Sequence, residues 1–130
     1  MADDTLKILI IDDSDLDRAF LMEVLRGIGI KNDFLEARTG EEAIEVLGKR
    51  YKEIGLIFLD WHLPKISGME FMAAMVNIPQ IADKPIIMIT ASSSDKNKES
   101  AAAANPNLAG YIVKPFTPES LIKAIEKYVR

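Results

Sequence analysis

Cysteine is absent from the sequence, which excludes a disulfide framework and thiolate metal ligands. Long hydrophobic runs are absent too, since no apolar stretch approaches the roughly 20 residues that a membrane-spanning helix needs. The first residues are acidic, whereas a secretory signal peptide begins with basic ones. We therefore expect a cytoplasmic protein that does not enter a membrane.

Basic residues are fewer than acidic ones, with 16 Lys and Arg against 20 Asp and Glu and a net charge of −4. Because the basic residues are scattered, nothing predicts binding to nucleic acid or to anionic lipid. The 130 residues, 48% hydrophobic and 28% charged, suit one compact domain without low-complexity tracts. We expect a single domain over residues 1–130, with no separate output domain.

Apolar runs of strand length alternate with segments of helical period along the chain. They predict strands at 6–12, 33–37, 56–60, 84–91 and 110–115, and helices at 14–29, 39–50, 67–76, 95–104 and 117–130. Parallel strands need crossover connections, and here those connections are helical. The pattern therefore predicts an α/β fold, a doubly wound five-stranded parallel sheet with five helices.

The expected helices carry recognisable start signals and apolar faces. The predicted N-caps are Ser14, Thr39, Ser67 and Thr117. In the first helix the apolar residues that recur at helical spacing are Leu16, Phe20, Leu21, Val24 and Leu25. In the last helix the apolar residues expected to face inward are Leu121, Ile122, Ile125 and Val129. Three methionines at 69, 72 and 75 are expected in the core rather than in a partner groove.

Polar residues stand where four of these strands end. Asp12 and Asp13 follow the first strand, Asp60 ends the third, Thr90 the fourth and Lys114 the fifth. In a doubly wound sheet, ligands bind outside the carboxyl ends of the strands. Carboxylates gathered there repel one another by roughly 4 kcal/mol per close pair at an effective dielectric constant of ~20. A cation is expected, and oxygen ligands suit Mg²⁺.

The same residues predict a chemistry. A carboxylate can attack phosphorus to form an acyl phosphate, with a metal ion and a lysine offsetting the charge. The pair Asp12 and Asp13 is better suited to holding the metal, and the lone Asp60 to attacking. Thr90 offers a hydroxyl to a phosphoryl oxygen, and Lys114 a compact positive charge.

The order of acidic pair, lone aspartate, threonine and Lys-Pro on successive strand ends resembles the receiver domain of two-component response regulators. The resemblance covers essentially the whole chain and implies a flavodoxin-like receiver topology. It implies that Asp60 is the phosphoacceptor, and that Asp12, Asp13, the Asp60 carboxylate and the backbone carbonyl of His62 bind Mg²⁺.

The resemblance also implies a conformational switch. Thr90 would be the switch hydroxyl, Tyr111 the switch aromatic and Lys114 the phosphate-binding lysine, with a cis bond before Pro115. In the family, the phosphoryl group draws the threonine inward and the aromatic ring follows. The face built from helix four, strand five and helix five then changes, which only requires that the phosphoryl oxygens favour one conformer.

The implied partners are a histidine kinase or a histidine phosphotransfer protein as phosphodonor, and a downstream effector protein. On this reading the domain is no enzyme beyond assisting its own phosphorylation and dephosphorylation. The ring of His62, the only histidine, is either incidental or a control on water access to the acyl phosphate.

Three other readings stay open. A Mg²⁺-dependent phosphatase of the haloacid-dehalogenase type uses similar groups, but its nucleophile follows the first strand in an Asp-x-Asp pattern, whereas Asp12-Asp13-Ser14 stands here. An unphosphorylated pseudo-receiver is the second. A phosphorelay intermediate without its own output is the third.

Overall fold

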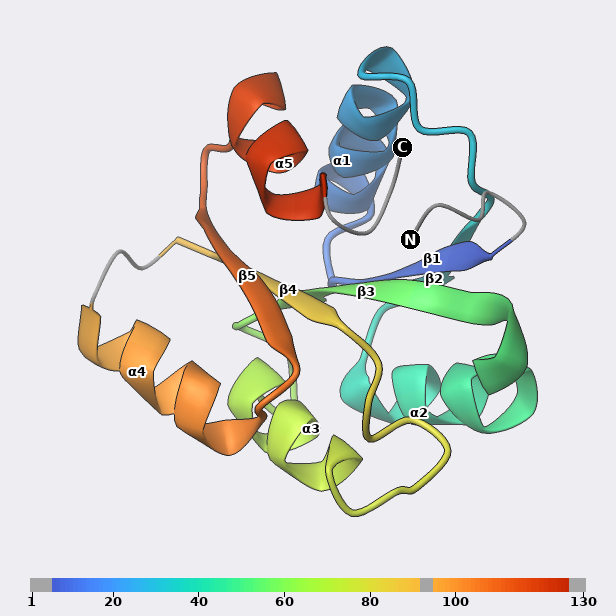
Figure 1. Ribbon diagram of the computed structural model, residues 1–130, viewed down its shortest axis with the longest axis vertical. Coiled ribbons are helices and arrows are strands. Elements are labelled where there is room, and N and C mark those ends of the chain that lie inside the picture. The colour runs from blue at the N-terminus through green and yellow to red at the C-terminus, as the bar shows by residue number, and fades with distance from the viewer. Residues whose placement is uncertain (1–5, 92–94, 127–130) are drawn as a thin grey trace.

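The computed structural model describes residues 6–91 and 95–126, and Figure 1 shows its course. The strands are β1 (Lys7–Ile11), β2 (Phe34–Ala37), β3 (Ile54–Asp60), β4 (Ile86–Thr90) and β5 (Leu108–Val113). The helices are α1 (Asp15–Gly27), α2 (Gly40–Arg50), α3 (Gly68–Met75), α4 (Asp95–Ala104) and α5 (Pro118–Ile125), with a short 3₁₀ helix, η1 (Tyr51–Glu53). The predicted alternation of strands and helices is confirmed.

The five strands form one parallel sheet in the order β2-β1-β3-β4-β5. Helices α1 and α5 cover one face, while α2, α3 and α4 cover the other (Figure 1). The strand order reverses between β1 and β3, so these two neighbours flank the switch point of the doubly wound sheet. Residues that follow β1 and β3 therefore lie at the usual ligand position.

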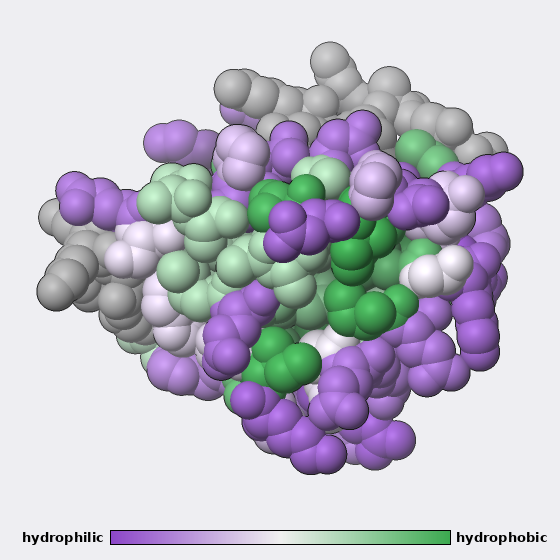
Figure 2. Space-filling model, turned by 90° about the horizontal axis from the view of Figure 1, so that it is seen from below, coloured by the Kyte–Doolittle hydropathy of each residue, from purple (hydrophilic) through white to green (hydrophobic). Residues whose placement is uncertain are grey.

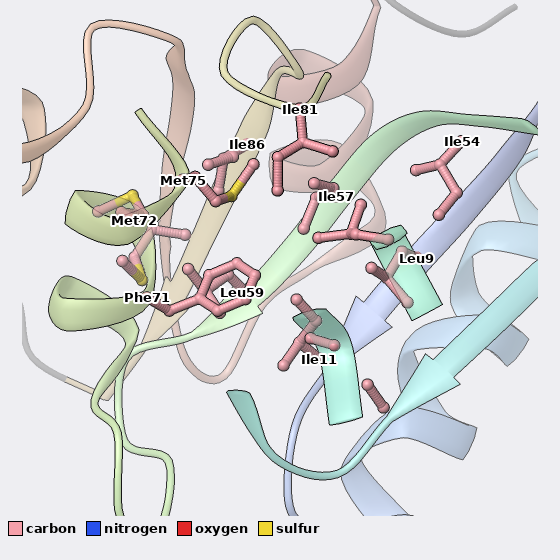
Figure 3. Close-up of a cluster of buried hydrophobic side chains, with 14 of the residues drawn as sticks. Leu9, Ile11, Ile54, Ile57, Leu59, Phe71, Met72, Met75, Ile81 and Ile86 are labelled. Atoms are coloured by element: carbon pink, nitrogen blue, oxygen red, sulfur yellow. The ribbon is translucent and has the colours of Figure 1, made fainter. Parts of the chain in front are cut away.

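Each face of the sheet has its own buried layer. Leu9, Ile57 and Leu59 point toward α2, α3 and α4, where they meet Phe71, Met72 and other residues in Figure 3. Ile8, Ile10 and Phe58 point the other way, toward α1 and α5. Successive side chains of a strand point to opposite faces of the sheet, and both faces are buried here. This explains why the strand sequences are continuously apolar. Met72 and Met75 are buried and Met69 packs against the same layer, which confirms the core prediction.

The predicted N-caps form in the structure. The side-chain oxygens of Ser14, Thr39, Ser67 and Thr117 each accept a hydrogen bond from the backbone N–H three residues later. At Ser67 the bond is reciprocated, since the Glu70 carboxylate accepts from the Ser67 N–H. Helix α4 ends at Ala104, as Pro106 predicts.

The prediction that the apolar residues of the last helix face inward is wrong in part, and α1 also exposes some of its regularly spaced apolar residues. Leu16 is 78% exposed, and Phe20 is 50% exposed while its ring stacks on Phe116 at 5.3 Å between centroids. Ile122 is 46% exposed, and Val129 lies outside the described residues. A helix on a sheet buries a narrow stripe, which α1 fills with Leu21 and Leu25, so residues at the border of that stripe remain in solvent.

Two strands have bounds that differ from the predicted ones. Strand β3 begins at Ile54, and β5 runs from Leu108 to Val113 rather than from 110 to 115. The pairing of Leu108 with Ile86 extends β5 backwards, and the Lys114–Pro115 bond is cis, as the resemblance implies. Pro115 has no N–H to continue the ladder.

The face below the sheet in Figure 1 carries apolar side chains among charged ones, as Figure 2 shows. A hollow lies there between α2 and the segment after α3, lined mainly by Ile44, Leu47, Tyr51, Ile78 and Ile81. Among the described helices, none combines the length and the apolar character needed to cross a membrane.

Gly68 allows α3 to begin directly against the end of β3. Its N–H donates to the carbonyl of Trp61 at 2.9 Å. A Cβ at this position would lie 2.6 Å from the carbonyl oxygen of Asp60, which is backbone and cannot rotate away. A side chain here would therefore push apart the two segments that position Asp60.

Replacing this glycine should destabilise the protein. Gly68→Ala is expected to lower the free energy of unfolding by about 1–3 kcal/mol, the usual cost of overpacking. The matched control is Gly48→Ala in α2, where an added Cβ meets nothing within 4 Å. That change should be neutral or stabilise by up to about 1 kcal/mol, since alanine favours a helix. Urea unfolding of both variants measures the difference, and equal stabilities would contradict the packing argument.

Candidate functional site

Three carboxylates meet at the carboxyl ends of β1 and β3. Asp12 and Asp60 are each 7% exposed, while Asp13 is exposed, and one oxygen of each lies within 4.8 Å of the others. Backbone N–H groups hold two of them in place. The N–H of Ser14 donates to Asp12 Oδ1 at 2.9 Å, and the N–H of His62 donates to Asp60 Oδ1 at 3.1 Å. The structure therefore brings together the three predicted metal-ligating side chains.

Lys114 reaches into the same pocket from the end of β5. Its Nζ lies 3.7 Å from Asp60 Oδ2 and 3.4 Å from Asp12 Oδ2. Its nearest carboxylate is Asp17 in the first turn of α1, with Oδ2 at 2.9 Å. The backbone N–H of Lys114 donates to the Thr90 carbonyl at 2.7 Å, which fixes the base of the side chain.

Thr90 and Tyr111 lie together on the paired strands β4 and β5. Thr90 ends β4 and is completely buried. The Tyr111 side chain, from β5, is hydrogen-bonded to Thr90, and its ring meets Trp61 edge-on at 6.4 Å between centroids. Trp61 directly follows Asp60, so these side chains connect the carboxylate end of β3 to β5.

Burial and crowding govern the charges in the pocket. Burial, reinforced by the Asp12 charge, raises the pKa of Asp60 to about 6, although the His62 N–H and Lys114 oppose the shift. Burial disfavours the charged form of Lys114, but the hydrogen bond with Asp17 and the neighbouring carboxylates raise its pKa overall. The pocket therefore holds more negative charge than its lysine balances.

The donor set fits a hard divalent cation. Carboxylate oxygens without a histidine ring or a thiolate are the ligands that Mg²⁺ prefers. The geometry suits it as well, because one carboxylate oxygen from each of the three residues lies within 4.8 Å of the others at the ends of β1 and β3. The raised pKa of Asp60 indicates that its charged form lacks full compensation from the protein alone.

Arg18 is a site residue that the sequence analysis did not identify. Its side chain is buried on α1, and its Nη1 donates to the carbonyl of Asp12 at 2.6 Å. Its Nε donates to Glu36 at 2.9 Å, and its Nη2 pairs with Asp15. The signal that could have revealed it is a charged residue at the position expected to face the sheet, one turn after the Ser14 cap.

The sheet order and the pocket define a class of protein, the doubly wound α/β domains with an acidic pocket and an opposing lysine at the switch point. Residues 8–126 match the family model of the response regulator receiver domain. The chain belongs to this family.

Similar proteins agree with the assignment. A chemotaxis protein CheY homolog from Campylobacter jejuni is 34% identical over 121 residues, which cover 93% of this chain and 90% of the relative. Chemotaxis protein CheY1 from Helicobacter pylori is 33% identical, with 93% and 94% covered. The solved structure of chemotaxis protein CheY4 from Vibrio cholerae superposes with a TM-score of 0.81 at 30% identity, covering 95% of this chain and 98% of that one.

These matches favour a receiver domain over a phosphatase. The chain is a receiver domain of the CheY type, the domain of a phosphorylation-activated signalling switch in two-component systems. Nothing in the comparisons supports the phosphatase of the haloacid-dehalogenase type. Receiver domains bind Mg²⁺ at an acidic pocket, and the cluster of Asp12, Asp13 and Asp60 supplies such a pocket here.

Removing the Asp60 charge should stabilise the metal-free protein. The folded-state pKa of about 6 exceeds the ordinary value of 3.8, so the ionised form is disfavoured in the fold. In chelator, Asp60→Asn should raise the free energy of unfolding at pH 7 by on the order of 2 kcal/mol.

The stability gained by Asp60→Asn should depend on pH. Near pH 4 the carboxyl carries a proton in the folded state and for much of the time in the unfolded chain, so the two proteins should be about equally stable. The difference should grow as the pH rises from about 4 to about 6, where only the unfolded chain loses its proton, and should level off above that. Urea unfolding at several pH values measures it. A difference that is the same at pH 4 and pH 7 would show that the charge on Asp60 is not the cause.

Proposed function

We propose that this receiver domain accepts a phosphoryl group on Asp60 and passes the change to a partner through its surface. The observation that carries the proposal is the lone, buried Asp60 carboxylate, which lies beside both the acidic pair and Lys114. Asp12 and Asp13 are placed to bind a metal ion together. Asp60 ends the central strand, and its Oδ2 lies 3.7 Å from the Lys114 ammonium. The same geometry supports a module whose chemistry is limited to its own phosphorylation and dephosphorylation.

In the proposed transfer, an Asp60 oxygen attacks phosphorus and forms a new P–O bond. The bond from phosphorus to the donor nitrogen or oxygen breaks, and its electron pair leaves with the donor. The N–H of His62 holds the other carboxylate oxygen. The ammonium of Lys114 and the hydroxyl of Thr90 bind phosphoryl oxygens as charge develops on them.

Mg²⁺ would be held by Asp12, Asp13 and Asp60, together with the backbone carbonyl of His62. When bound, it supplies positive charge that offsets the carboxylates and the transferring group. The role of the His62 carbonyl rests on the family resemblance alone. The imidazole of His62 is exposed at the rim of the pocket, consistent with an incidental role or with control of water access.

The proposed switch uses Thr90 and Tyr111. A phosphoryl oxygen that draws the Thr90 hydroxyl inward changes the hydrogen bond that Tyr111 makes. The ring then moves relative to Trp61, and the face formed by α4, β5 and α5 changes shape. That face is already hollowed along β5 and α5, between Tyr111, Ser120 and Lys123, which gives an effector a concave surface to recognise.

The proposed phosphodonor is a histidine kinase or a histidine phosphotransfer protein, and the proposed location is the cytoplasm. Leu16 and Phe20 on α1 are exposed, and Phe116 packs on Phe20 directly after the Lys114–Pro115 bond. These apolar residues stand beside the pocket, where a donor protein needs a contact surface. A relay role between two histidine-bearing proteins would use the same site.

Phosphorylation should be detectable by intact-mass spectrometry. After incubation with acetyl phosphate and Mg²⁺, the wild-type chain should gain the mass of one phosphoryl group, and Asp60→Asn should gain none. Chelation of Mg²⁺ should prevent the gain, because the carboxylates would repel the anionic donor.

A wild-type chain without an adduct should next be tested for binding of beryllium fluoride, a stable phosphoryl mimic, in case hydrolysis is fast. Failure of both would identify an unphosphorylated pseudo-receiver. An adduct that persists in Asp60→Asn would place the phosphoacceptor elsewhere.

The switch should depend on the Thr90 hydroxyl. In wild type and in Thr90→Ser, beryllium fluoride with Mg²⁺ should shift the backbone NMR signals of β5, residues 108–113. In Thr90→Ala the mimic should still bind at Asp60, but the shifts around Tyr111 should be greatly reduced because the hydrogen-bond partner is missing. Shifts of full size in Thr90→Ala would contradict the proposed switch.

A further inference from the structure

We infer that Asp17 restrains Lys114 in the unphosphorylated protein and thereby slows phosphoryl transfer to Asp60. The inference rests on the proposed function, because it concerns the same lysine and the same nucleophile. It assigns Asp17 as a positioning residue, since its carboxylate acts through Lys114 and has no contact with the reacting atoms.

The distances place the ammonium nearer to Asp17 than to either pocket carboxylate. Lys114 Nζ lies 2.9 Å from Asp17 Oδ2, which is hydrogen-bond distance for an ion pair. The corresponding distances are 3.4 Å to Asp12 and 3.7 Å to Asp60. The lysine is therefore drawn toward α1 and away from the oxygen that would carry the phosphoryl group.

Both partners of this ion pair start from fixed backbone positions. The N–H of Asp17 donates to the Ser14 cap at 3.1 Å, at the start of α1. The N–H of Lys114 donates to the Thr90 carbonyl at 2.7 Å, at the end of β4. Because neither backbone segment is free to follow the other, the lysine reaches a phosphoryl oxygen by changing its side-chain torsions and giving up part of its bond with Asp17.

The cost of giving up that bond is limited by solvent. The Asp17 side chain is 48% exposed and that of Lys114 is 25% exposed, so the pair resembles a surface ion pair more than a buried one. Pairs of this kind change an equilibrium or a rate by about two- to fivefold. Asp17 should therefore moderate the phosphorylation rate without abolishing phosphorylation.

The test compares initial rates of phosphorylation by acetyl phosphate and Mg²⁺, followed by intact-mass spectrometry. In the reaction, the Asp60 carboxylate forms a P–O bond and acetate leaves with the electron pair of the broken P–O bond. Asp17→Asn should react about two- to fivefold faster than wild type, with a smaller difference at high salt. Asp17→Glu, which keeps the charge, should stay near the wild-type rate.

Two further variants separate this ion pair from a general change of charge. Glu23→Gln removes one exposed negative charge further along α1 and should leave the rate unchanged. In a Lys114→Gln background, Asp17→Asn should have no effect on the rate, because the restrained group is gone.

The outcomes distinguish this inference from the proposed function. If the wild-type chain takes up no phosphoryl group, the proposed function fails. If it does, a rate for Asp17→Asn equal to or below that of wild type overturns the inference alone. So does an acceleration that persists in Lys114→Gln, or one that Glu23→Gln reproduces.

Discussion

Repulsion among carboxylates at one edge of the sheet is the constraint on which the pocket depends. Asp12 and Asp60 are buried beside each other, and burial together with the neighbouring charge keeps a proton on Asp60 up to about pH 6. Such an arrangement costs stability unless positive charge is near. Lys114 supplies one such charge, and Arg18 on α1 donates a hydrogen bond to the backbone carbonyl of Asp12. The remaining negative charge makes the pocket receptive to a metal ion.

The topology of the sheet creates this crowding. Parallel strands end on the same edge, and the reversal of strand order between β1 and β3 opens a space there. Continuous apolar strands then fix the register from both faces, so the side chain that follows each strand has little freedom of position. Gly68 completes the arrangement by allowing α3 to start against the carbonyl of Asp60.

Much of the fold and the pocket could be predicted from the sequence, because period and strand endings are local signals. Asp12, Asp60 and Lys114 stand directly after apolar runs, so the parallel-sheet rule was enough to group them. The contact between Lys114 and Asp17 could not be predicted, since it depends on side-chain torsions across 97 residues of sequence. The exposure of Phe20 was missed because helical spacing does not show how wide a stripe the sheet covers.

The hydrogen bond between the Lys114 N–H and the Thr90 carbonyl affects how fast the pocket can respond to an incoming phosphoryl group. It joins the backbones of the two residues that would face a phosphoryl group, so their separation is set by the sheet before any ligand arrives. What remains adjustable is the rotation of side chains, which is faster than the collective rearrangements that take microseconds or longer. The pocket can therefore meet an incoming group almost at once, and slower steps belong to the surface that reports it.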